Sequence, residues 1–386
     1  MNILKKAQAL TDELVALRRD FHQYPETGFE VTRTAEIVAR HLETSGIDVQ
    51  RNIGKSGVVG ILKITKPAGT IGFRSELDAL EMDEENDLEF KSRHPGKAHT
   101  CGHDAHIAML LGAAKTLARH RGSLKKNIRF LFQPSEEKLP GGAQAMIREG
   151  ALDGVDECFG IHVTPKYETG KFGARSGPVL AAPDNFFVRI IGQGGHAGIP
   201  QLCVDPIVIG AEIIQAFQNV VSRESDPLQS VVVSVCKVHA GTTSNVIPES
   251  MMLEGTVRTL SKEIRETVAS RLEEIVRGIS QAHRAKCEFR YDRGYPVTVN
   301  DAECVEKTRA AVLKLFGQEG FVAASNPLMA GDDIAYMLER VKGSLIFMGC
   351  RRRGEPIIPN HHPRFTIDEV CLPLGTALFC QLAGAD

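Results

Sequence analysis

The stretch HTCGHDAHIAMLLGAAKTLAR (residues 99–119) joins a dense group of metal-binding side chains to a predicted amphipathic helix. One cysteine, three histidines and one aspartate fall within its first eight residues. Thiolate, imidazole and carboxylate groups are the usual protein ligands of divalent transition metals. Apolar residues then recur at helical spacing; they are Ile107, Leu110, Leu111, Ala114 and Leu117. The stretch therefore predicts a metal site at the start of an amphipathic helix.

Short apolar runs flank this stretch and are bounded by Gly, Pro or charged residues, as expected of strands. They cover residues 57–64, 70–75, 127–132 and 156–162. Helical periodicity marks residues 4–20, 30–44, 106–119 and 142–149, with Gly46 expected to end the second helix. Alternation of strands and helices predicts an α/β fold with a mostly parallel sheet.

The pattern of predicted strands and helices changes near Pro183, and the α/β pattern resumes after Pro296. Between these points the pattern predicts strands at 185–191, 230–238, 251–259 and 286–291, with helices at 206–222 and 261–284. The order β-α-β-β-α-β is that of a ferredoxin-like α+β domain. We therefore predict a metal-binding catalytic domain of residues 1–182 and 297–386, into which a second domain of residues 183–296 is inserted.

The composition argues against a nucleic-acid-binding, membrane-spanning or secreted protein. The chain has 386 residues, of which 42% are hydrophobic and 24% charged, as is ordinary for a globular protein. A net charge of −2 gives no electrostatic case for binding nucleic acid. No apolar run has the length of a membrane span, and the charged first residues do not resemble a signal peptide. Nine scattered cysteines favour reduced thiols, so we expect a cytoplasmic location.

Further polar residues follow the predicted strands. Asp78 comes after TIGFRSE, Glu136 and Glu137 after NIRFLFQP, and His162 ends CFGIH. Ligands bind outside the carboxyl ends of strands in open α/β sheets, so these residues are expected to meet the CGHD segment there. The positive end of the following helix is expected to bias Cys101 toward thiolate.

Such a set suits a pair of metal ions about 3.5–4 Å apart, between which water becomes hydroxide near neutral pH. One carboxylate of an adjacent pair can bind metal while the other moves a proton from the water to a departing amine. The pair Glu136-Glu137 fits this requirement. The residues thus predict a metal-dependent hydrolase.

Each residue also has a simpler interpretation. Cys101 could be a small buried hydrophobe, and Asp104 could only cap the helix. Glu136-Glu137 could be a solvated surface pair, and His361-His362 a turn between prolines. Two other functions stay open: a thiol hydrolase with Cys101 as nucleophile, and a catalytically silent metal-binding protein.

Over nearly its whole length the chain resembles the aminoacylase, hippurate hydrolase and auxin-conjugate hydrolase family of metallo-amidohydrolases. The matching motifs, in the family's order, are HTCGHDAH, QPSEE, GIHV, GGHAGIPQLCVDPI, SNVIP, LEGTVRT and HHPRF. The resemblance implies two divalent metal ions per subunit, zinc or manganese, with cobalt or nickel as further options. It also implies a homodimer or homotetramer, with the inserted domain serving as lid and dimerisation domain.

Site residues follow from the same resemblance. The implied metal ligands are Cys101, His103, Glu137, His162 and His361, with Cys101 bridging. Glu136 would be the general acid/base, and Asp78 joins it among the catalytic residues. His196 would polarise the scissile carbonyl, in some relatives from across a dimer. Asn245, Arg258 and a glycine turn at Gly331 would hold the substrate.

The chain departs from the family's usual pattern at a few positions. Glu76 stands where relatives commonly carry Asp, Gln201 where a histidine is frequent, and Asp333-Ile334 where an acidic-aromatic pair is usual. These changes concern the substrate pocket and the residues behind the ligands. We predict hydrolysis of the amide bond of N-acyl amino acids (acetyl, benzoyl or similar), with a dipeptidase or aminopeptidase as the alternative.

Overall fold

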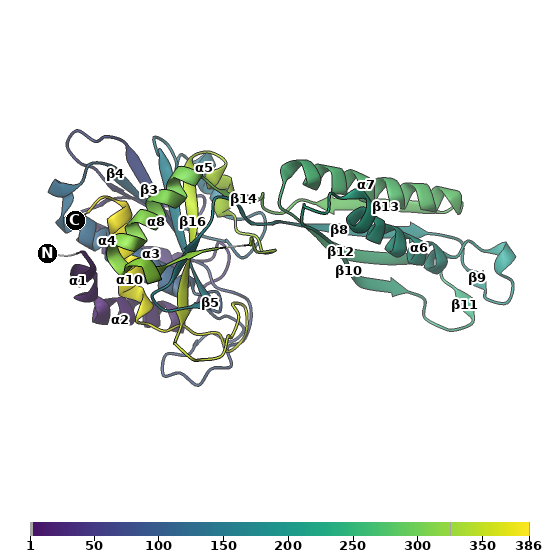
Figure 1. Ribbon diagram of the computed structural model, residues 1–386. Helices are drawn as coiled ribbons and strands as arrows, with labels where there is room; N and C mark the ends of the chain where they lie inside the picture. The colour runs from purple at the N-terminus through teal and green to yellow at the C-terminus, as the bar shows by residue number, and fades with distance from the viewer. Residues whose placement is uncertain (1–2, 325, 386) are drawn as a thin grey trace. The chain divides into compact units, whose positions relative to one another are not determined.

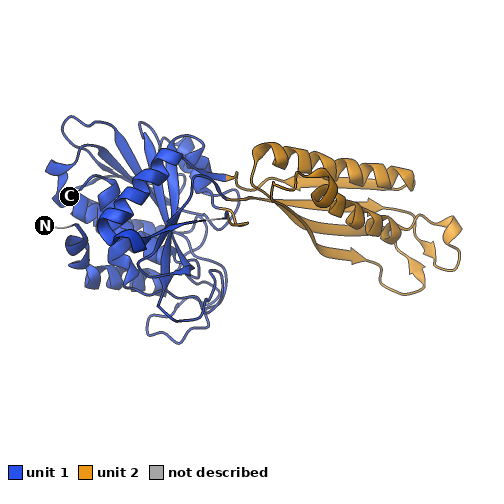
Figure 2. Cartoon of the chain, viewed as in Figure 1, with its two compact units in different colours: residues 1–179, 298–326, 332–386 blue, residues 180–297, 327–331 orange. Residues whose placement is uncertain are grey.

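The computed structural model of the protein describes residues 3–324 and 326–385. These residues form two compact units (Figure 2). Unit 1 lies within residues 1–179, 298–326 and 332–386, and unit 2 comprises residues 180–297 and 327–331. The chain therefore leaves unit 1, builds most of unit 2, and returns to complete unit 1.

Unit 1 is built on an eight-stranded sheet (Figure 1). Its strands, in spatial order, are β1 (Asp48–Ile53), β2 (Gly57–Leu62), β4 (Asn127–Gln133), β3 (Thr70–Glu76), β5 (Glu157–Glu168), β16 (Lys342–Arg351), β6 (Phe172–Ala174) and β15 (Phe321–Ala323). The central strands β4, β3, β5 and β16 pair in parallel, while β1, β2 and β6 make the antiparallel pairings. The predicted α/β fold with a mostly parallel sheet is confirmed.

The helices of unit 1 are α1 (Ile3–Gln8), α2 (Thr11–Gln23), α3 (Thr32–Thr44), α4 (His103–Arg119), α5 (Ala143–Arg148), α8 (Ala302–Phe316), α9 (Ile334–Leu338) and α10 (Cys371–Leu382). Short turns η1 (Arg121–Ser123) and η4 (Gln318–Gly320) and the short paired strands β7 (Gly177–Leu180) and β14 (Thr298–Asn300) complete the chain outside unit 2.

The first predicted helix differs from the structure, and the end of the second agrees with it. The helix predicted over residues 4–20 is two helices, because the Leu10 amide donates to the Ala7 carbonyl and closes a tight turn. Gly46 follows helix α3 with φ +72°, as predicted. A residue without Cβ adopts this left-handed conformation at little cost.

Helix α4 lies in the middle of unit 1. Helices α3, α4, α10 and α8 pack along the sheet, and α1 and α2 contact α4 and α10 from the other side. Almost every residue of α4 up to Leu117 is buried, with Lys115 the exception. A Cβ added at Gly112 would lie 2.6 Å from Leu14, so α2 approaches closely at this point. Apolar residues on more than one side of α4 are expected where both its faces are covered.

Unit 2 follows the order β-α-β-β-α-β. Its main elements are β8 (Ala182–Ile191), α6 (Pro206–Asn219), β10 (Val231–Ala240), β12 (Ser250–Thr259), α7 (Lys262–Ala282) and β13 (Lys286–Asp292). Smaller ones are β9 (Gly195–His196), η2 (Pro200–Leu202), the π-helical turn η3 (Val220–Glu224) and β11 (Val246–Ile247). The four-stranded sheet is antiparallel, in the order β10-β12-β8-β13, which is the ferredoxin-like topology.

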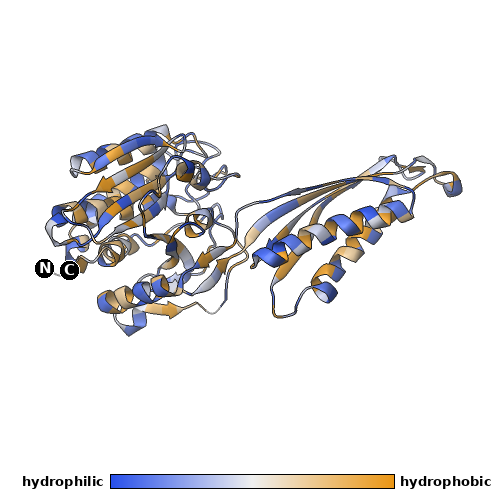
Figure 3. Cartoon of the chain, turned by 90° about the horizontal axis from the view of Figure 1, so that it is seen from above, coloured by the Kyte–Doolittle hydropathy of each residue, from blue (hydrophilic) through white to orange (hydrophobic). Residues whose placement is uncertain are grey.

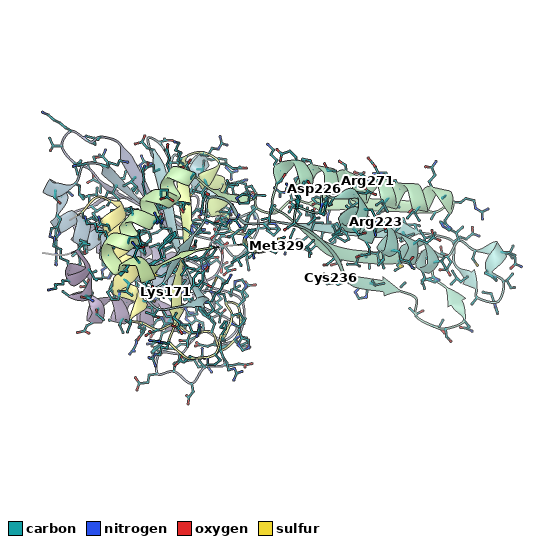
Figure 4. The ribbon with its side chains drawn as sticks, viewed as in Figure 1. Lys171, Arg223, Asp226, Cys236, Arg271 and Met329 are labelled. Atoms are coloured by element: carbon teal, nitrogen blue, oxygen red, sulfur yellow. The ribbon has the colours of Figure 1, made fainter. Side chains whose placement is uncertain are left out.

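Helices α6 and α7 cover one face of the unit 2 sheet (Figure 1). Alternate residues of β8, namely Phe186, Val188 and Ile190, face these helices and are buried, as the period of a half-buried strand requires. Apolar residues also run along the strands of both sheets (Figure 3). Arg271 of α7, labelled in Figure 4, forms an ion pair with Glu224 at the end of η3.

Among the described residues, no helix has the length and apolarity needed to span a bilayer. All nine cysteines are free thiols, consistent with the prediction from their spacing.

Candidate metal centre

The five predicted ligands lie together near the points where β3 and β4 end. Two groups of three side chains share Cys101: one adds His103 and His162, the other Glu137 and His361, with ligand atoms within 4.8 Å of one another in each group. The Cys101 Sγ atom lies 3.4 Å from His162 Nε2, and His361 Nε2 lies 3.4 Å from Glu137 Oε1. One thiol common to both groups is what a bridge between two ions requires.

Hydrogen bonds orient two of the histidine rings toward the cluster. Nδ1 of His103 lies 2.8 Å from the Asp78 carbonyl oxygen, and Nδ1 of His162 lies 2.8 Å from the Val163 carbonyl oxygen. A carbonyl only accepts, so Nδ1 carries the proton and the Nε2 lone pair of each ring is free for a metal. His103 Nε2 is buried and has no hydrogen-bond partner among the described residues. These donors fit a divalent cation.

Asp78 holds the glutamate pair in place. Its two carboxylate oxygens accept hydrogen bonds from the backbone amides of Glu136 (2.9 Å) and Glu137 (3.1 Å), and the side chain is fully buried. Its own carbonyl fixes the His103 ring. Asp78 therefore acts on the neighbouring side chains by positioning them, and both its oxygens are already engaged.

His106 belongs to a buried network behind the ligands. Its Nε2 accepts a hydrogen bond from the Val163 amide (2.9 Å), so its proton sits on Nδ1 and is donated to Glu76 Oε2 (2.7 Å). Both ring nitrogens are occupied, which excludes His106 as a metal ligand in this arrangement. The other Glu76 oxygen pairs with Arg74, which is fully buried. The Glu76 side chain, longer than that of the Asp common in relatives, thus connects His106 to Arg74.

Asp104 and His99 lie on the other side of the helix start. Asp104 Oδ2 accepts hydrogen bonds from Arg18 Nε (2.8 Å) and His22 Nδ1 (2.7 Å), so Asp104 joins α4 to α2. The residue before the helix is Gly102, and it makes no side-chain cap. Asp104 Oδ1 also accepts a hydrogen bond from the Ala105 amide (2.9 Å) in the first helical turn, so the contacts with Arg18 and His22 add to the simple capping interpretation. His99 is buried, and burial lowers its pKa to about 3, so it is neutral.

The expected bias of Cys101 toward thiolate is wrong for the protein without metal. Burial, followed by the nearby carboxylates of Glu137 and Glu136, raises the pKa of the Cys101 thiol well above its usual range. These effects outweigh the positive end of helix α4. A thiolate here needs cations beside it, which argues against a metal-free nucleophile.

The two glutamates differ in their electrostatic surroundings. Burial, together with Asp332 and Glu137, raises the pKa of Glu136 well above its ordinary value. Burial also opposes ionisation of Glu137, but hydrogen bonding to His361 and the nearby His103 lower its pKa overall. His103 Nε2 lies 3.8 Å from Glu136 Oε2 and 3.9 Å from Glu137 Oε1. The pair therefore combines an ionised ligand candidate with a neighbour that readily holds a proton.

Backbone strain occurs at two loops of the centre. Ser135, just before the glutamate pair, has φ +55°, and His361 has φ +66°. Non-glycine residues in this left-handed region persist where surrounding contacts hold them, and they concentrate at functional sites. His162 departs from the prediction that it ends its strand, because β5 continues to Glu168 while pairing with β16.

The remaining predicted site residues belong to unit 2. His196 on β9 is exposed and pairs with Val246 on β11, next to Asn245, whose carbonyl accepts from the Ala197 amide (3.1 Å). Arg258 on β12 is half-buried, and its guanidinium donates to the Val257 carbonyl (2.9 Å). Gly331 packs on Pro183, where a Cβ would lie 2.5 Å from the ring. Their contact with substrate stays a prediction.

Sequence reasoning missed residues that support the ligands. Arg74 was a visible signal, because a charged residue inside an otherwise buried strand needs compensating partners. It contacts Asp333 (2.8 Å) and Asp332 (3.1 Å), and Asp333 also accepts from Gln133 and from the Ala143 amide. The substitution Asp333-Ile334 thus keeps a buried acid in this network.

Comparison with known proteins identifies the family of this chain. Residues 72–385 match the model of "Peptidase family M20/M25/M40". An N-acyl-L-amino acid amidohydrolase from Geobacillus stearothermophilus is 44% identical over 289 residues, covering 75% of this chain and 78% of the relative. Thermostable carboxypeptidase 1 from Saccharolobus solfataricus is 36% identical, covering 97% of this chain and 95% of the relative.

A solved structure supports the same relationship. A dinuclear metal-binding peptidase of the M20 family from Bacillus subtilis superimposes with a TM-score of 0.85 at 33% identity. The match covers 97% of this chain and 98% of that one. The family resemblance inferred from the motifs is therefore confirmed.

Proposed function

The chain belongs to peptidase family M20/M25/M40, and from this premise we propose that it hydrolyses the amide bond of N-acyl amino acids. The products are a carboxylic acid and the free amino acid. Because relatives of this family hydrolyse amide bonds, the chain is a metal-dependent hydrolase of amide bonds. The observation that carries the proposal is the shared position of Cys101 in two ligand groups, with Glu136 beside them.

The residues that would hold two divalent ions are Cys101, His103, Glu137, His162 and His361, of which Cys101 belongs to both groups of side chains. Mixed thiolate, imidazole and carboxylate donors suit zinc, and also manganese, cobalt or nickel. When bound, such ions polarise the scissile carbonyl and make water acidic enough to attack it near neutral pH.

Glu136 is proposed to move the proton. Its carboxylate accepts a proton from the attacking water as the new carbon–oxygen bond forms, and then delivers it to the amine nitrogen as the carbon–nitrogen bond breaks. Burial raises the pKa of Glu136 in the metal-free protein, which favours retention of the proton between the two steps, while bound cations would oppose this shift and allow the carboxylate to accept it first. Asp78 keeps the backbone amides of Glu136 and Glu137 in register throughout.

The variant Glu136→Gln tests this role. It should lower kcat about 10²–10⁴-fold, because a neutral amide cannot accept the proton. Its metal content by elemental analysis should equal that of the unaltered protein. Glu306→Gln, an exposed change on helix α8, is the matched control. Retained turnover in Glu136→Gln would refute the assignment.

The same machinery could act on short peptides, and the similarity to a carboxypeptidase favours testing this. A panel of N-acetyl and N-benzoyl amino acids and dipeptides compares the two substrate classes directly. Activity that survives thorough chelation but is lost on thiol alkylation would instead identify Cys101 as a nucleophile. Bound metal without turnover on any member of the panel would identify a silent relative.

Unit 2 is proposed to act as lid and to supply substrate contacts. His196 would polarise the scissile carbonyl, while Asn245, Arg258 and Gly331 would hold the amino acid portion. His196 is exposed and lies beside Asn245, which supports a role of both residues in contacting the substrate. His196→Ala should lower kcat by at least about tenfold with no loss of metal; unchanged kcat would remove His196 from the mechanism.

We also propose a homodimer in the cytoplasm, formed through unit 2. Strand β10 is an edge strand, and its second half is exposed, including Val238 and the labelled Cys236 (Figure 4). An exposed edge offers unpaired backbone groups to a second copy. Sedimentation of the unaltered protein and of Val238→Lys should show a dimer and a monomer, respectively; a monomer in both cases contradicts the proposal.

A further inference from the structure

The side-chain amide of Asn360 connects segments that are far apart in sequence. Its Nδ2 atom donates hydrogen bonds to the Cys101 carbonyl (3.0 Å) and to the Val163 carbonyl (3.3 Å). Asn360 itself immediately precedes His361. One amide group therefore contacts the backbone beside two candidate ligands and is covalently adjacent to a third. We propose that Asn360 is a positioning residue that holds these three ligand-bearing segments in a common geometry.

The Val163 peptide is the point where these contacts meet. Its carbonyl accepts from both Asn360 Nδ2 and His162 Nδ1, which a carbonyl oxygen with two lone pairs allows. Its amide donates to His106 Nε2, part of the buried network that ends at Arg74. Asn360 and the His162 ring thus donate to the same Val163 carbonyl. Loss of the Asn360 hydrogen bond would therefore change the position of the carbonyl that orients the His162 ring.

Packing leaves these segments little room to adjust. Gly102, next to Cys101, has φ +93°, and a Cβ placed there would lie 2.3 Å from Val163 Cγ2. The Cys101 turn and strand β5 are therefore in direct contact. A hydrogen bond that fixes the Val163 carbonyl therefore also fixes the residue that packs against the turn containing Cys101.

The loop that carries Asn360 needs such an anchor. Residues 352–357 are exposed, and His361 has a left-handed φ of +66°. The His361 amide donates to the Thr100 carbonyl (2.9 Å), and Asn360 adds the two bonds described above. These contacts tie an exposed loop to the buried side of the centre, and they hold His361 in a backbone conformation that it would otherwise leave.

This inference rests on the proposed function, because it takes Cys101, His162 and His361 as metal ligands. Groups that orient ligands without touching the metal typically change metal affinity about 10–100-fold when removed. Loss of the Asn360 amide should therefore weaken metal binding more than it affects the fold.

The test compares Asn360→Leu, which keeps the shape and removes the donor, with Asn360→Ala. Asn219→Ala, an exposed change at the end of α6, is the control. Dissociation constants for Zn²⁺ and Mn²⁺ are measured by competition with a chelating dye, and thermal unfolding is followed on the metal-free proteins. Both Asn360 variants should bind metal about 10–100-fold more weakly, with metal-free midpoints like that of the control. At saturating metal, kcat should return to within about threefold and KM should be unchanged.

Metal affinity within twofold of the unaltered protein in both variants would overturn the proposal. So would a weaker affinity matched by a lower unfolding midpoint of the metal-free protein, because that would show a general structural role. Failure of the unaltered protein to bind any metal would instead refute the proposed function, so the two failures are distinguishable.

Discussion

The buried charged network around Arg74 in unit 1 and the one around Asp184 in unit 2 differ in their balance of charge. In unit 1 a single guanidinium, that of Arg74, faces three carboxylates, those of Glu76, Asp332 and Asp333. In unit 2 the fully buried Asp184 pairs with Arg265 (2.5 Å) and also accepts from Tyr291 Oη and the Gly294 amide (2.8 Å each). The first network is rich in negative charge, and the second is balanced.

The difference separates a functional network from a structural one. Burial raises the pKa of Asp333 to about 7 and also raises that of Asp332, in spite of Arg74. Buried ionised groups are costly unless paired. Unit 1 therefore has a deficit of positive charge close to the candidate ligands, which divalent cations would correct, whereas unit 2 has satisfied its charges with its own residues. Cation binding should stabilise unit 1 alone.

The largest expected effect comes from removing the centre of the unit 1 network. Arg74→Met should lower the free energy of unfolding of the metal-free protein by about 3–5 kcal/mol, because buried carboxylates lose their partner. Chemical denaturation of the metal-free protein measures this. A loss smaller than that caused by Asp184→Asn in unit 2 would reverse the comparison between the networks.

A pH series on the metal-free protein should show the excess of acid in unit 1. A carboxyl group whose folded pKa is raised stabilises the fold below its unfolded pKa, and this contribution is lost as pH rises through the folded pKa. For Asp333 the window runs from about 4 to about 7. Stability should therefore fall across it, and Asp333→Asn should flatten the decline. An equal slope in both proteins would assign the pH dependence to other groups.

A smaller loss is expected from Asp184→Asn in unit 2. The amide still accepts hydrogen bonds, while Arg265 keeps the Gly294 carbonyl as a partner at 2.9 Å. We expect a loss of about 1–3 kcal/mol, with metal dissociation constants unchanged. Denaturation and dye competition on the same sample measure both quantities. Weaker metal binding in this variant would show that the two networks are not independent.

The smallest effect should come from the surface of unit 2. Arg271 pairs with Glu224 and Glu274, but its side chain is 37% exposed and Glu274 is 60% exposed. Exposed ion pairs contribute about 0–1 kcal/mol and are screened by salt. Arg271→Ala should therefore change stability by less than about 1 kcal/mol, and high salt should erase even that. A loss comparable to that of Asp184→Asn would show that this pair anchors helix α7.

The sequence predicted features that depend on local pattern. Alternating residues in β8 and the helical stripe of α4 follow from periodicity, and both elements occur where expected. The ligand cluster was predictable because Glu136, Glu137 and the CGHD segment each border a strand or helix end on the same edge of the sheet. The family motifs then selected His361 from a distant loop.

What could not be predicted depends on tertiary contacts. The protonation of Cys101 is set by burial and by carboxylates from another segment, which outweigh the helix end that the sequence displays. His106 stands in the same motif as the ligands, and only the Val163 amide on its Nε2 removes it from the set. Asn360 lies in an ordinary polar loop, and its two acceptors come from segments about two hundred or more residues earlier.

The placement of β16 has a consequence for biosynthesis. This strand pairs with β5 in the middle of the unit 1 sheet, and α10, at the end of the chain, packs on α4. Every pairing of the four-stranded sheet of unit 2 lies within residues 182–292 and is complete before β16 leaves the ribosome. The nascent chain must therefore carry an open half-sheet, with the hydrogen-bonding edge of β5 unpaired, until β16 has been synthesised. Ribosome-associated chaperones would meet that half-sheet first.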